Sequence, residues 1–373
     1  MAGIERKRVN RRRFLQGAAT LGLGVWLRRC LGRAFPAARA VTLEEGVAAA
    51  PTPAGGGGTI KLDRHVYLPY VTRQGPLAHG PSKLGLHTQR PNAAVAFVQA
   101  VHDAGAHVAL VKALDEFGYL RAVKRVSPET VTVARSMVAQ TVDPIGDPAE
   151  AAAAMMSKHM PKWEYEKDVV DYYENRPPTV AGQVWLAHFF SAAMTIAEAH
   201  GYKLALFSYS TGVPQWHEWE AIVDTGLFAQ AKAGGHALAL HEYDWPTMDY
   251  RWSEPTEDLP PYEDRGVLAG RYRYLYRDFL VPRDEVVPLL ITECGLDPAL
   301  HRPGQPTTWK ERYVQEMAWY DTRLREDDYV VGAAMFTLGA AWGWDSYDYE
   351  ELLWPGNLYG ANFLDYIVSL KDA

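Results

Sequence analysis

Residues 204–241 read LALFSYSTGVPQWHEWEAIVDTGLFAQAKAGGHALALH, and this stretch decides the fold. It opens with a short apolar run, residues 204–208, and closes with another, residues 237–241. Between them lies a segment of helical period, residues 218–233, followed by two glycines where a helix would end. Two apolar strands joined by a helix-length crossover form a parallel pair that is buried on both faces. The stretch therefore predicts a β–α–β unit.

The alternation of a short apolar run with a helical segment recurs from residue 83 to the end of the sequence. Eight such units in roughly 300 residues are typical of a (β/α)8 TIM barrel, which is a single α/β domain. An open doubly wound sheet would show a glycine-rich phosphate turn after its first strand, whereas residues 87–91 (HTQRP) contain no glycine. The other candidate strands are residues 83–87, 107–112, 131–135, 169–174, 288–293 and 330–337. The clearest other helices are residues 92–104, 180–200, 267–280, 309–325 and 360–370.

The first 40 residues have the layout of an export signal. A charged segment, residues 1–13, precedes an apolar run, residues 14–27, and Ala38-Arg39-Ala40 forms a small-residue end. Residues 11–16, RRRFLQ, resemble the twin-arginine motif, which implies export of a folded protein by the twin-arginine machinery of a bacterial inner membrane. We therefore expect a periplasmic or extracellular protein. A basic amphipathic anchor that is never cleaved is the alternative.

A spacer and one large domain follow the predicted signal. Residues 41–58, VTLEEGVAAAPTPAGGGG, are small and rich in Pro and Gly, which is typical of a flexible linker. Residues 59–373 are expected to form the barrel domain. The chain has two cysteines, and removal of the signal would leave only Cys294, so we expect no internal disulfide.

The net charge of −7 combines two parts of opposite sign. Residues 1–40 hold ten Lys and Arg residues and one Glu, so the rest of the chain holds 28 basic and 44 acidic residues. An acidic body repels phosphate backbones and anionic lipids. The charge therefore argues against nucleic acid as a partner, and against stable membrane association once the signal has been removed.

Polar side chains stand at the ends of the predicted strands. In a (β/α)8 barrel the C-terminal ends of the strands meet at one mouth, where active sites lie. Charged groups that end buried apolar strands are costly unless they are paired or used. Their convergence on one rim predicts a functional site. These residues are His87, Lys112, Arg135, Glu174, Ser208, His241, Glu293 and Thr337.

Residues 291–295, ITECG, carry the sharpest functional signal. Strand alternation puts Glu293 on the same face as Leu289 and Ile291, which we expect to be the barrel interior. A carboxylate at the end of the seventh strand is placed to attack or stabilise an electrophilic carbon over the barrel axis.

The sixth strand ends in His241-Glu242-Tyr243, where His241 and Tyr243 share a face and Glu242 takes the other. Because the sixth and seventh strands are neighbours, we expect both His241 and Tyr243 to reach Glu293. A purely structural ion pair between Glu293 and a basic neighbour such as Arg135 is the alternative.

These motifs resemble those of the clan A glycoside hydrolases, the 4/7 superfamily, whose TIM barrels carry a catalytic Glu at the ends of strands four and seven. The ITECG segment is similar to the strand-seven nucleophile motif, and Tyr243 to the strand-six Tyr that hydrogen-bonds the nucleophile. Trp342 and Trp344 are similar to the Trp that stacks on sugar in that clan. The resemblance implies a carbohydrate substrate, with Glu293 as the nucleophile.

The fourth strand departs from the clan pattern of Asn-Glu-Pro, because residues 172–178 read YYENRPP. One alignment makes Glu174 the acid/base. The other places Asn175 on the Asn of the clan and Arg176 where the acid/base Glu is expected. A separation of about 5 Å between Glu174 and Glu293 would fit retaining hydrolysis, and one of ~6.5–9.5 Å would fit inversion.

The sequence thus predicts an exported glycoside hydrolase that uses a double-carboxylate, retaining mechanism, with Glu293 and Glu174 as the catalytic pair and without a metal or an organic cofactor. One alternative is a non-catalytic carbohydrate-binding barrel derived from such a hydrolase, in which Arg176 has displaced the acid. Another is a lyase or aldolase that forms a Schiff base on Lys112. The expected substrate-binding residues are His87, Arg135, Asn175, His241, Tyr243, Trp342 and Trp344.

Overall fold

The computed structural model describes residues 80–91, 93–137, 142–163, 169–171, 179–255, 260–298, 308–341 and 343–373. The expected signal (1–40) and linker (41–58) lie outside the described residues, as do residues 59–79 of the expected barrel domain.

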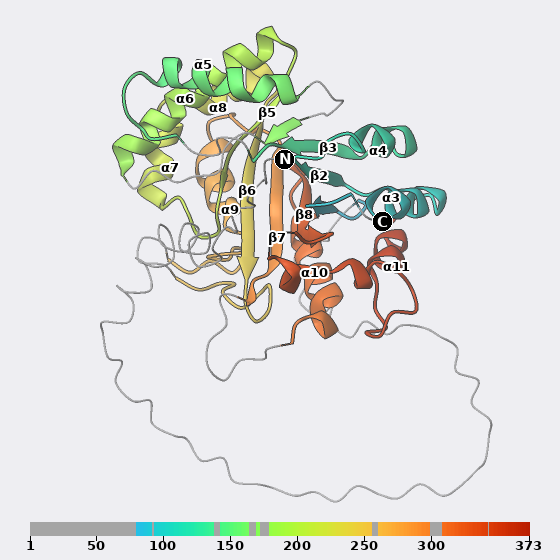
Figure 1. Ribbon diagram of the computed structural model, residues 1–373. Coiled ribbons are helices and arrows are strands. Elements are labelled where there is room, and N and C mark those ends of the chain that lie inside the picture. The colour runs from blue at the N-terminus through green and yellow to red at the C-terminus, as the bar shows by residue number, and fades with distance from the viewer. Residues whose placement is uncertain are drawn as a thin grey trace, which may run out of the picture.

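Eight parallel strands close into a barrel in chain order, with the last strand paired to the first (Figure 1). This topology confirms the predicted (β/α)8 fold, and every strand lies at a predicted apolar run. The strands are β1 (Leu84–Thr88), β2 (Leu110–Leu114), β3 (Val131–Arg135), β4 (Val169–Asp171), β5 (Leu204–Tyr209), β6 (Ala237–Asp244), β7 (Leu289–Leu296) and β8 (Val330–Leu338).

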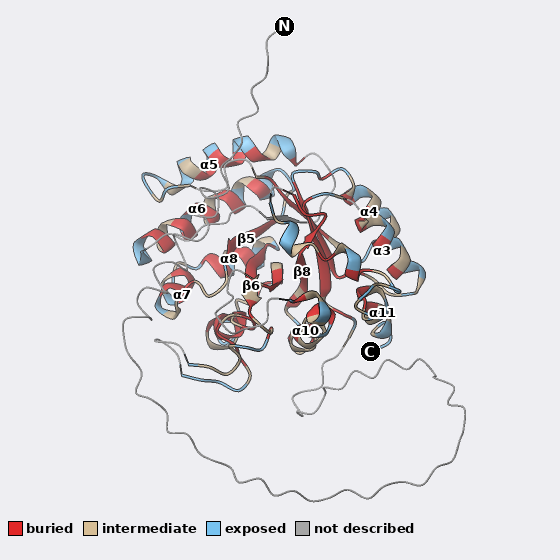
Figure 2. Ribbon diagram, turned by 60° about the horizontal axis from the view of Figure 1, so that its bottom comes forward, coloured by how far each residue is buried: buried red, intermediate tan, exposed pale blue. Residues whose placement is uncertain are grey.

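Helices form a ring around the barrel and turn their buried faces toward the strands (Figure 2). They are α3 (Ala94–Asp103), α4 (Leu120–Val126), α5 (Pro148–His159), α6 (Val180–Ala199), α7 (Trp216–Val223), α8 (Leu227–Gly234), α9 (Tyr272–Leu275), α10 (Lys310–Leu324) and α11 (Phe363–Ser369). A π-helical turn, η2 (Tyr276–Leu280), continues α9, and short 3₁₀ turns are η1 (Met160–Lys162), η4 (Asp345–Tyr347) and η5 (Glu350–Leu352).

Some helices differ from the prediction. The helix expected over residues 218–233 is divided into α7 and α8, because Gly226 has a φ of 77° and no L side chain favours that conformation. The helix expected over residues 267–280 begins only at Tyr272. Helices α4 and α5 were missed, although Asp147 caps α5 by accepting hydrogen bonds from two of its first amides, a recognisable helix start.

Apolar side chains fill an inner and an outer layer. The members of the inner layer come only from strands, so they point into the barrel; the outer layer packs strands against helices. On β2, β3 and β6, the residue two positions after the last inner-layer residue is polar: these residues are Lys112, Arg135 and His241. The barrel interior therefore changes from apolar to polar at that level. The inner layer consists of Leu110, Val133, Ala205, Ala237, Ala239, Leu290 and Ala334.

Helix α6 has the length and composition of a membrane-spanning segment, and half of its most apolar window is buried inside the fold. A core helix of a folded domain has the same properties. The middle of α6 agrees with that role, because Phe189 and Phe190 are fully buried in the core.

Candidate active site

Glu293 points into the barrel mouth because β7 is irregular. The pairing of β6 and β7 shifts register, so that His241 pairs with Glu293 although the residue before His241 pairs with Ile291. Such a bulge turns the next side chain to the other face of the strand. The expectation that Glu293 shares a face with Leu289 and Ile291 is therefore wrong: both pack in the outer layer, and Leu290 is the residue that points inside.

The glycine of the ITECG segment is required by the backbone and by packing. Gly295 has a φ of 145°, and a Cβ atom there would lie 2.5 Å from the hydroxyl oxygen of Tyr313. Any other residue would therefore push away Tyr313, which α10 holds in the core, or move the strand that carries Glu293.

Three basic side chains converge on the Oε1 atom of Glu293. Lys112 Nζ lies 3.2 Å from Oε1, Arg135 Nη1 lies 3.4 Å away and His87 Nε2 lies 3.5 Å away. The side chain of Glu293 is 13% exposed, whereas those of the three basic residues are at most 4% exposed. The carboxylate is thus the member of this cluster that a molecule entering the mouth can reach.

The other carboxylate oxygen, Oε2, faces β6. The hydroxyl of Tyr243 donates a hydrogen bond of 3.1 Å to Oε2, and His241 Nδ1 lies 3.4 Å from the same atom. Both contacts were expected from the alternation of β6. Together with the contacts at Oε1, they fix the plane of the carboxylate from two sides.

The surroundings keep Glu293 ionised. Burial favours the neutral acid, but the charges of His241 and Lys112 and the contact with His87 outweigh it and hold the pKa of Glu293 well below its usual range. Burial and the negative charge of Glu293 raise the pKa of Tyr243 well above its ordinary value, so its phenol keeps its proton and acts as a donor. The site therefore holds a carboxylate at neutral pH.

His87 is a neutral member of this cluster. Burial lowers its pKa to about 4, and the charge of Lys112 acts in the same direction, although the contact with Glu293 opposes them. Its Nδ1 atom lies 2.9 Å from the hydroxyl oxygen of Thr337 on β8. His87 therefore links β8 to Glu293 without adding a charge at neutral pH.

Aromatic rings from β8 and the segment after it stand beside this cluster. The ring of Phe336 lies 4.7 Å from His87, 6.3 Å from Tyr243 and 5.3 Å from Trp344 between centroids. Trp344 is half-buried and also packs edge-on against Tyr347. Sequence reasoning found Trp344 but missed Phe336, which its position directly before the strand-end Thr337 would have indicated.

Several predicted site residues lie outside the described residues. These are the strand-four residues Glu174, Asn175 and Arg176, and Trp342 after β8. The residues that the structure brings together are His87, Arg135, His241, Tyr243 and Glu293, joined by Lys112 and Thr337, which the prediction placed at strand ends but not among the binding residues.

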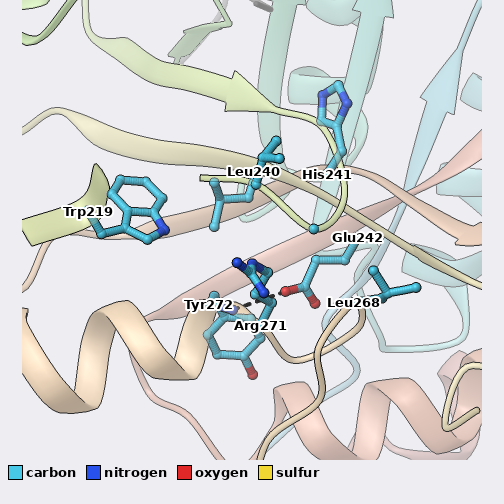
Figure 3. Close-up of a pocket in the computed structure, with 9 residues that line it drawn as sticks. Trp219, Leu240, His241, Glu242, Leu268, Arg271 and Tyr272 are labelled. Atoms are coloured by element: carbon cyan, nitrogen blue, oxygen red, sulfur yellow. Dashed lines mark hydrogen bonds between the residues drawn. The ribbon is translucent and has the colours of Figure 1, made fainter. Parts of the chain in front are cut away.

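Glu242 lies on the opposite side of β6 from His241, and Figure 3 shows the two side chains leaving the strand in opposite directions. Glu242 accepts hydrogen bonds from the amides of Gly270 (2.6 Å) and Tyr272 (3.1 Å) and from the hydroxyl of Tyr320 (2.7 Å). Burial raises the pKa of Glu242 to about 7, although these donors act in the opposite direction. Glu242 also lines a small pocket together with Trp219, Leu268 and Arg271.

The arrangement can support attack by a carboxylate or stabilisation of positive charge at the mouth. Glu293 is ionised, partly exposed and fixed in orientation, which are the properties of an enzymatic nucleophile or of a group that stabilises a cationic transition state. Within the described part of the chain, no group of three or more His, Cys, Asp or Glu side chains is arranged to hold a metal ion.

No protein-family model matches this sequence, and no curated protein matches it. Among solved structures, the chain is similar to a family 128 (subgroup II) endo-β-1,3-glucanase from Pseudomonas viridiflava, with 14% identity, a TM-score of 0.39, and coverage of 77% of this chain and 97% of that one. It is also similar to a family 39 glycoside hydrolase from Bacteroides cellulosilyticus, with 11% identity, a TM-score of 0.45, and coverage of 78% and 64%.

The similar structures also include an aldo-keto reductase from a deep-sea metagenome library, with 10% identity, a TM-score of 0.36, and coverage of 69% of this chain and 81% of that one. Glycoside hydrolases and a barrel of other chemistry are thus both among the solved structures that resemble this chain. At these identities and TM-scores the likeness carries no conclusion about activity.

Proposed function

We propose that this protein is a glycoside hydrolase in which Glu293 is the nucleophile. The observation that carries the proposal is the state of Glu293: an ionised carboxylate at the barrel mouth, held at Oε2 by the Tyr243 hydroxyl and partly open to solvent. The active sites of (β/α)8 barrels lie at this end of the strands. A sugar whose anomeric carbon lies above Glu293 would meet a carboxylate that needs no deprotonation before it attacks.

The proposed reaction has two steps. In the first, a carboxylate oxygen of Glu293 bonds to the anomeric carbon, the glycosidic bond breaks, and the leaving oxygen takes a proton from the general acid, for which Glu174 is our candidate. In the second, the same acid, now a base, removes a proton from water; the water oxygen bonds to the anomeric carbon, and Glu293 leaves as a carboxylate. Two inversions give net retention.

A carbohydrate substrate also fits the aromatic rings beside the cluster. Trp344 is half-buried at the mouth, and edge contacts with Phe336 and Tyr347 fix its orientation. A flat ring face that is held in place can stack on the C–H face of a sugar ring without losing further side-chain entropy. We propose that Trp344, with Trp342, forms the sugar platform.

The rival function is non-catalytic carbohydrate binding. The observation that favours it is the close approach of Lys112 and Arg135 to Oε1 of Glu293, since a buried ion-pair cluster can hold a barrel together with no chemistry. A Schiff-base reaction on Lys112 is less suited to the site. Its side chain is fully buried beside a carboxylate, whereas such a reaction needs an accessible neutral amine.

The test is a panel of aryl glycosides with good leaving groups, because such substrates need little help from an acid. Release of the aryl alcohol, lost in Glu293→Gln, would support the hydrolase. Binding of oligosaccharides with no release from any aryl glycoside would favour the rival. Proton NMR of the first-formed sugar then tests the stereochemistry: retention of the anomeric configuration is expected, and inversion would contradict the nucleophile role of Glu293.

We also propose that residues 1–40 direct export through the twin-arginine route. The support is the RRRFLQ sequence at residues 11–16 within a charged and then apolar segment. Replacement of Arg11 and Arg12 by Lys should keep the protein in the cytoplasm of a bacterial host, whereas the unaltered chain should reach the periplasm with its N-terminus near residue 41. Unchanged export of the Lys variant would contradict the proposal.

A further inference from the structure

His87 contacts both Glu293 and a residue of β8. Its two ring nitrogens have different neighbours: Nδ1 lies 2.9 Å from the hydroxyl oxygen of Thr337, and Nε2 lies 3.5 Å from Oε1 of Glu293. Both His87 and Thr337 are fully buried. The ring also packs against Phe336, so its orientation is fixed. The charged groups that face it are Glu293 from β7, Lys112 from β2 and Arg135 from β3.

A neutral imidazole carries one proton, and these neighbours decide which nitrogen holds it. Glu293 is an ionised carboxylate and can only accept a hydrogen bond. If Nε2 lacked the proton, its lone pair would face the charge of the carboxylate at 3.5 Å in a buried site. If Nε2 carries the proton, a donor lies 3.5 Å from the carboxylate oxygen in place of a lone pair, and Nδ1 becomes an acceptor for the Thr337 hydroxyl. The opposite tautomer would let Nδ1–H donate to Thr337 and the Thr337 hydroxyl donate to the carbonyl oxygen of His87, but it would leave the Nε2 lone pair facing the charge of Glu293.

We propose that Thr337 is a positioning residue that holds His87 in its Nε2–H form, so that a neutral donor faces Oε1 of Glu293. The hydroxyl of Thr337 donates to Nδ1 and thereby excludes a proton from that nitrogen. Its alternative acceptor, the carbonyl oxygen of His87, lies at 3.4 Å, farther than the 2.9 Å to Nδ1.

The Nε2–H donor affects the second step of the proposed reaction. This part of the inference rests on the proposed role of Glu293 as the nucleophile. A donor that faces the carboxylate stabilises its charged form, which makes Glu293 a weaker attacking group but a better leaving group. The donor therefore favours breakdown of the glycosyl-enzyme. Because the donor is neutral, it adds no positive charge to a mouth where Lys112 and Arg135 already stand.

The direct test is the tautomer itself. In ¹⁵N-labelled full-length protein, two-dimensional NMR of the imidazole groups distinguishes a protonated Nε2 from a protonated Nδ1, and a His87→Gln spectrum assigns the signal. We expect His87 to be neutral and protonated at Nε2 at pH 7. A proton on Nδ1, or on both nitrogens, would overturn the proposal. This readout needs no substrate, so it stands even if no glycoside is cleaved.

Thr337→Val removes the hydroxyl and keeps the shape, so the Nδ1–H form of His87 should become populated, whereas Thr337→Ser should restore the Nε2–H form. Where aryl glycosides are cleaved, those with the best leaving groups are limited by the second step. For them kcat should fall about tenfold in Thr337→Val, the scale of one hydrogen bond to a charged group, with kcat/KM changed much less.

Thr130→Val is the matched control. Thr130 is also fully buried and donates one hydrogen bond of 2.8 Å, to Ser127, at the opposite end of β3 from the site. The Thr130→Val protein should be less stable than the wild type, but its His87 tautomer and its ratio of kcat to kcat/KM should be unchanged. A Thr337→Val protein with an unchanged tautomer and an unchanged kcat would overturn the proposal, as would an equal effect in Thr130→Val.

Discussion

Glu242 is buried and Glu293 is partly buried on the neighbouring strand, and their carboxyl groups behave in opposite ways. Glu293 faces the barrel interior among basic side chains, and its pKa lies well below the usual range. Glu242 faces the helix layer, where it meets two backbone amides and the Tyr320 hydroxyl, and burial raises its pKa to about 7. Both carboxyl groups accept hydrogen bonds, so hydrogen bonding alone does not explain why their pKa values differ.

The difference lies in charge. Neutral donors compensate part of the cost of burying a carboxylate, but they leave the protonated acid competitive near neutral pH. The charges of His241 and Lys112 and the contact with His87 reverse that balance, and Glu293 stays ionised. The carboxylate at the barrel mouth is thus surrounded by basic side chains, whereas Glu242, which anchors a connection, is held by two backbone amides and a phenol.

The largest effect should come from removing the two carboxylates in turn. Glu293→Gln keeps the shape and deletes the nucleophile, so turnover of aryl glycosides should fall by more than about a thousandfold. Glu242→Gln makes the same chemical change one strand away, on the face that does not meet the mouth, and should keep activity within about tenfold. Equal losses in both variants would mean that the two sites are not functionally distinct.

The second prediction concerns stability. The pKa of Glu242 is about 7 in the folded protein against an ordinary value of 4.5, so between these pH values the unfolded chain ionises while the folded protein keeps its proton. Its contribution to stability is therefore complete below about pH 4.5 and declines as the pH rises to about 7, by a total of about 3 kcal/mol.

Urea unfolding of the wild type and Glu242→Gln over this pH range measures the effect. The free energy of unfolding of the wild type relative to the variant should fall as the pH rises. A difference that stays constant with pH would mean that the pKa of Glu242 is not raised in the folded protein.

The third prediction tests whether the cations around Glu293 cause the low pKa that distinguishes it from Glu242. Lys112→Met removes one of the cations at Oε1 and keeps the aliphatic stem, so the pKa of Glu293 should rise by about one unit. Because the carboxylate form is the active one, the acid limb of the kcat/KM profile should move to higher pH by the same amount. Lys124→Met on α4, where the lysine donates hydrogen bonds to the carbonyl oxygens of Pro128 and Thr130, serves as the control and should leave the profile unchanged.

Much of the fold could be predicted from the sequence. Parallel strands that are buried on both faces form short, continuous apolar runs, and the crossovers between them have helical period. All eight strands lie at such runs. The division of residues 218–233 was not readable from periodicity, since α7 and α8 share the same apolar spacing and only the left-handed conformation of Gly226 separates them. The residues before Tyr272 carry a helical pattern, yet they form the connection that Glu242 anchors.

The contacts of the site were readable only in part. Alternation along β6 correctly placed His241 and Tyr243 against Glu293. Alternation along β7 failed, because a bulge is a property of two paired strands and leaves no signature in one of them. The approach of Lys112 and His87 to Oε1 could not be derived either, since it depends on how the mouth closes across strands distant in sequence.

The central claim is that Glu293 forms a bond to sugar, and covalent trapping tests it most directly. A 2-deoxy-2-fluoro glycoside with a good leaving group slows the second step more than the first, so the glycosyl-enzyme should accumulate. Intact mass should rise by one fluorosugar, and peptide mapping should place the label on Glu293, with no label in Glu293→Gln. A label on another residue, or hydrolysis of aryl glycosides by Glu293→Gln at the rate of the wild type, would contradict the assignment.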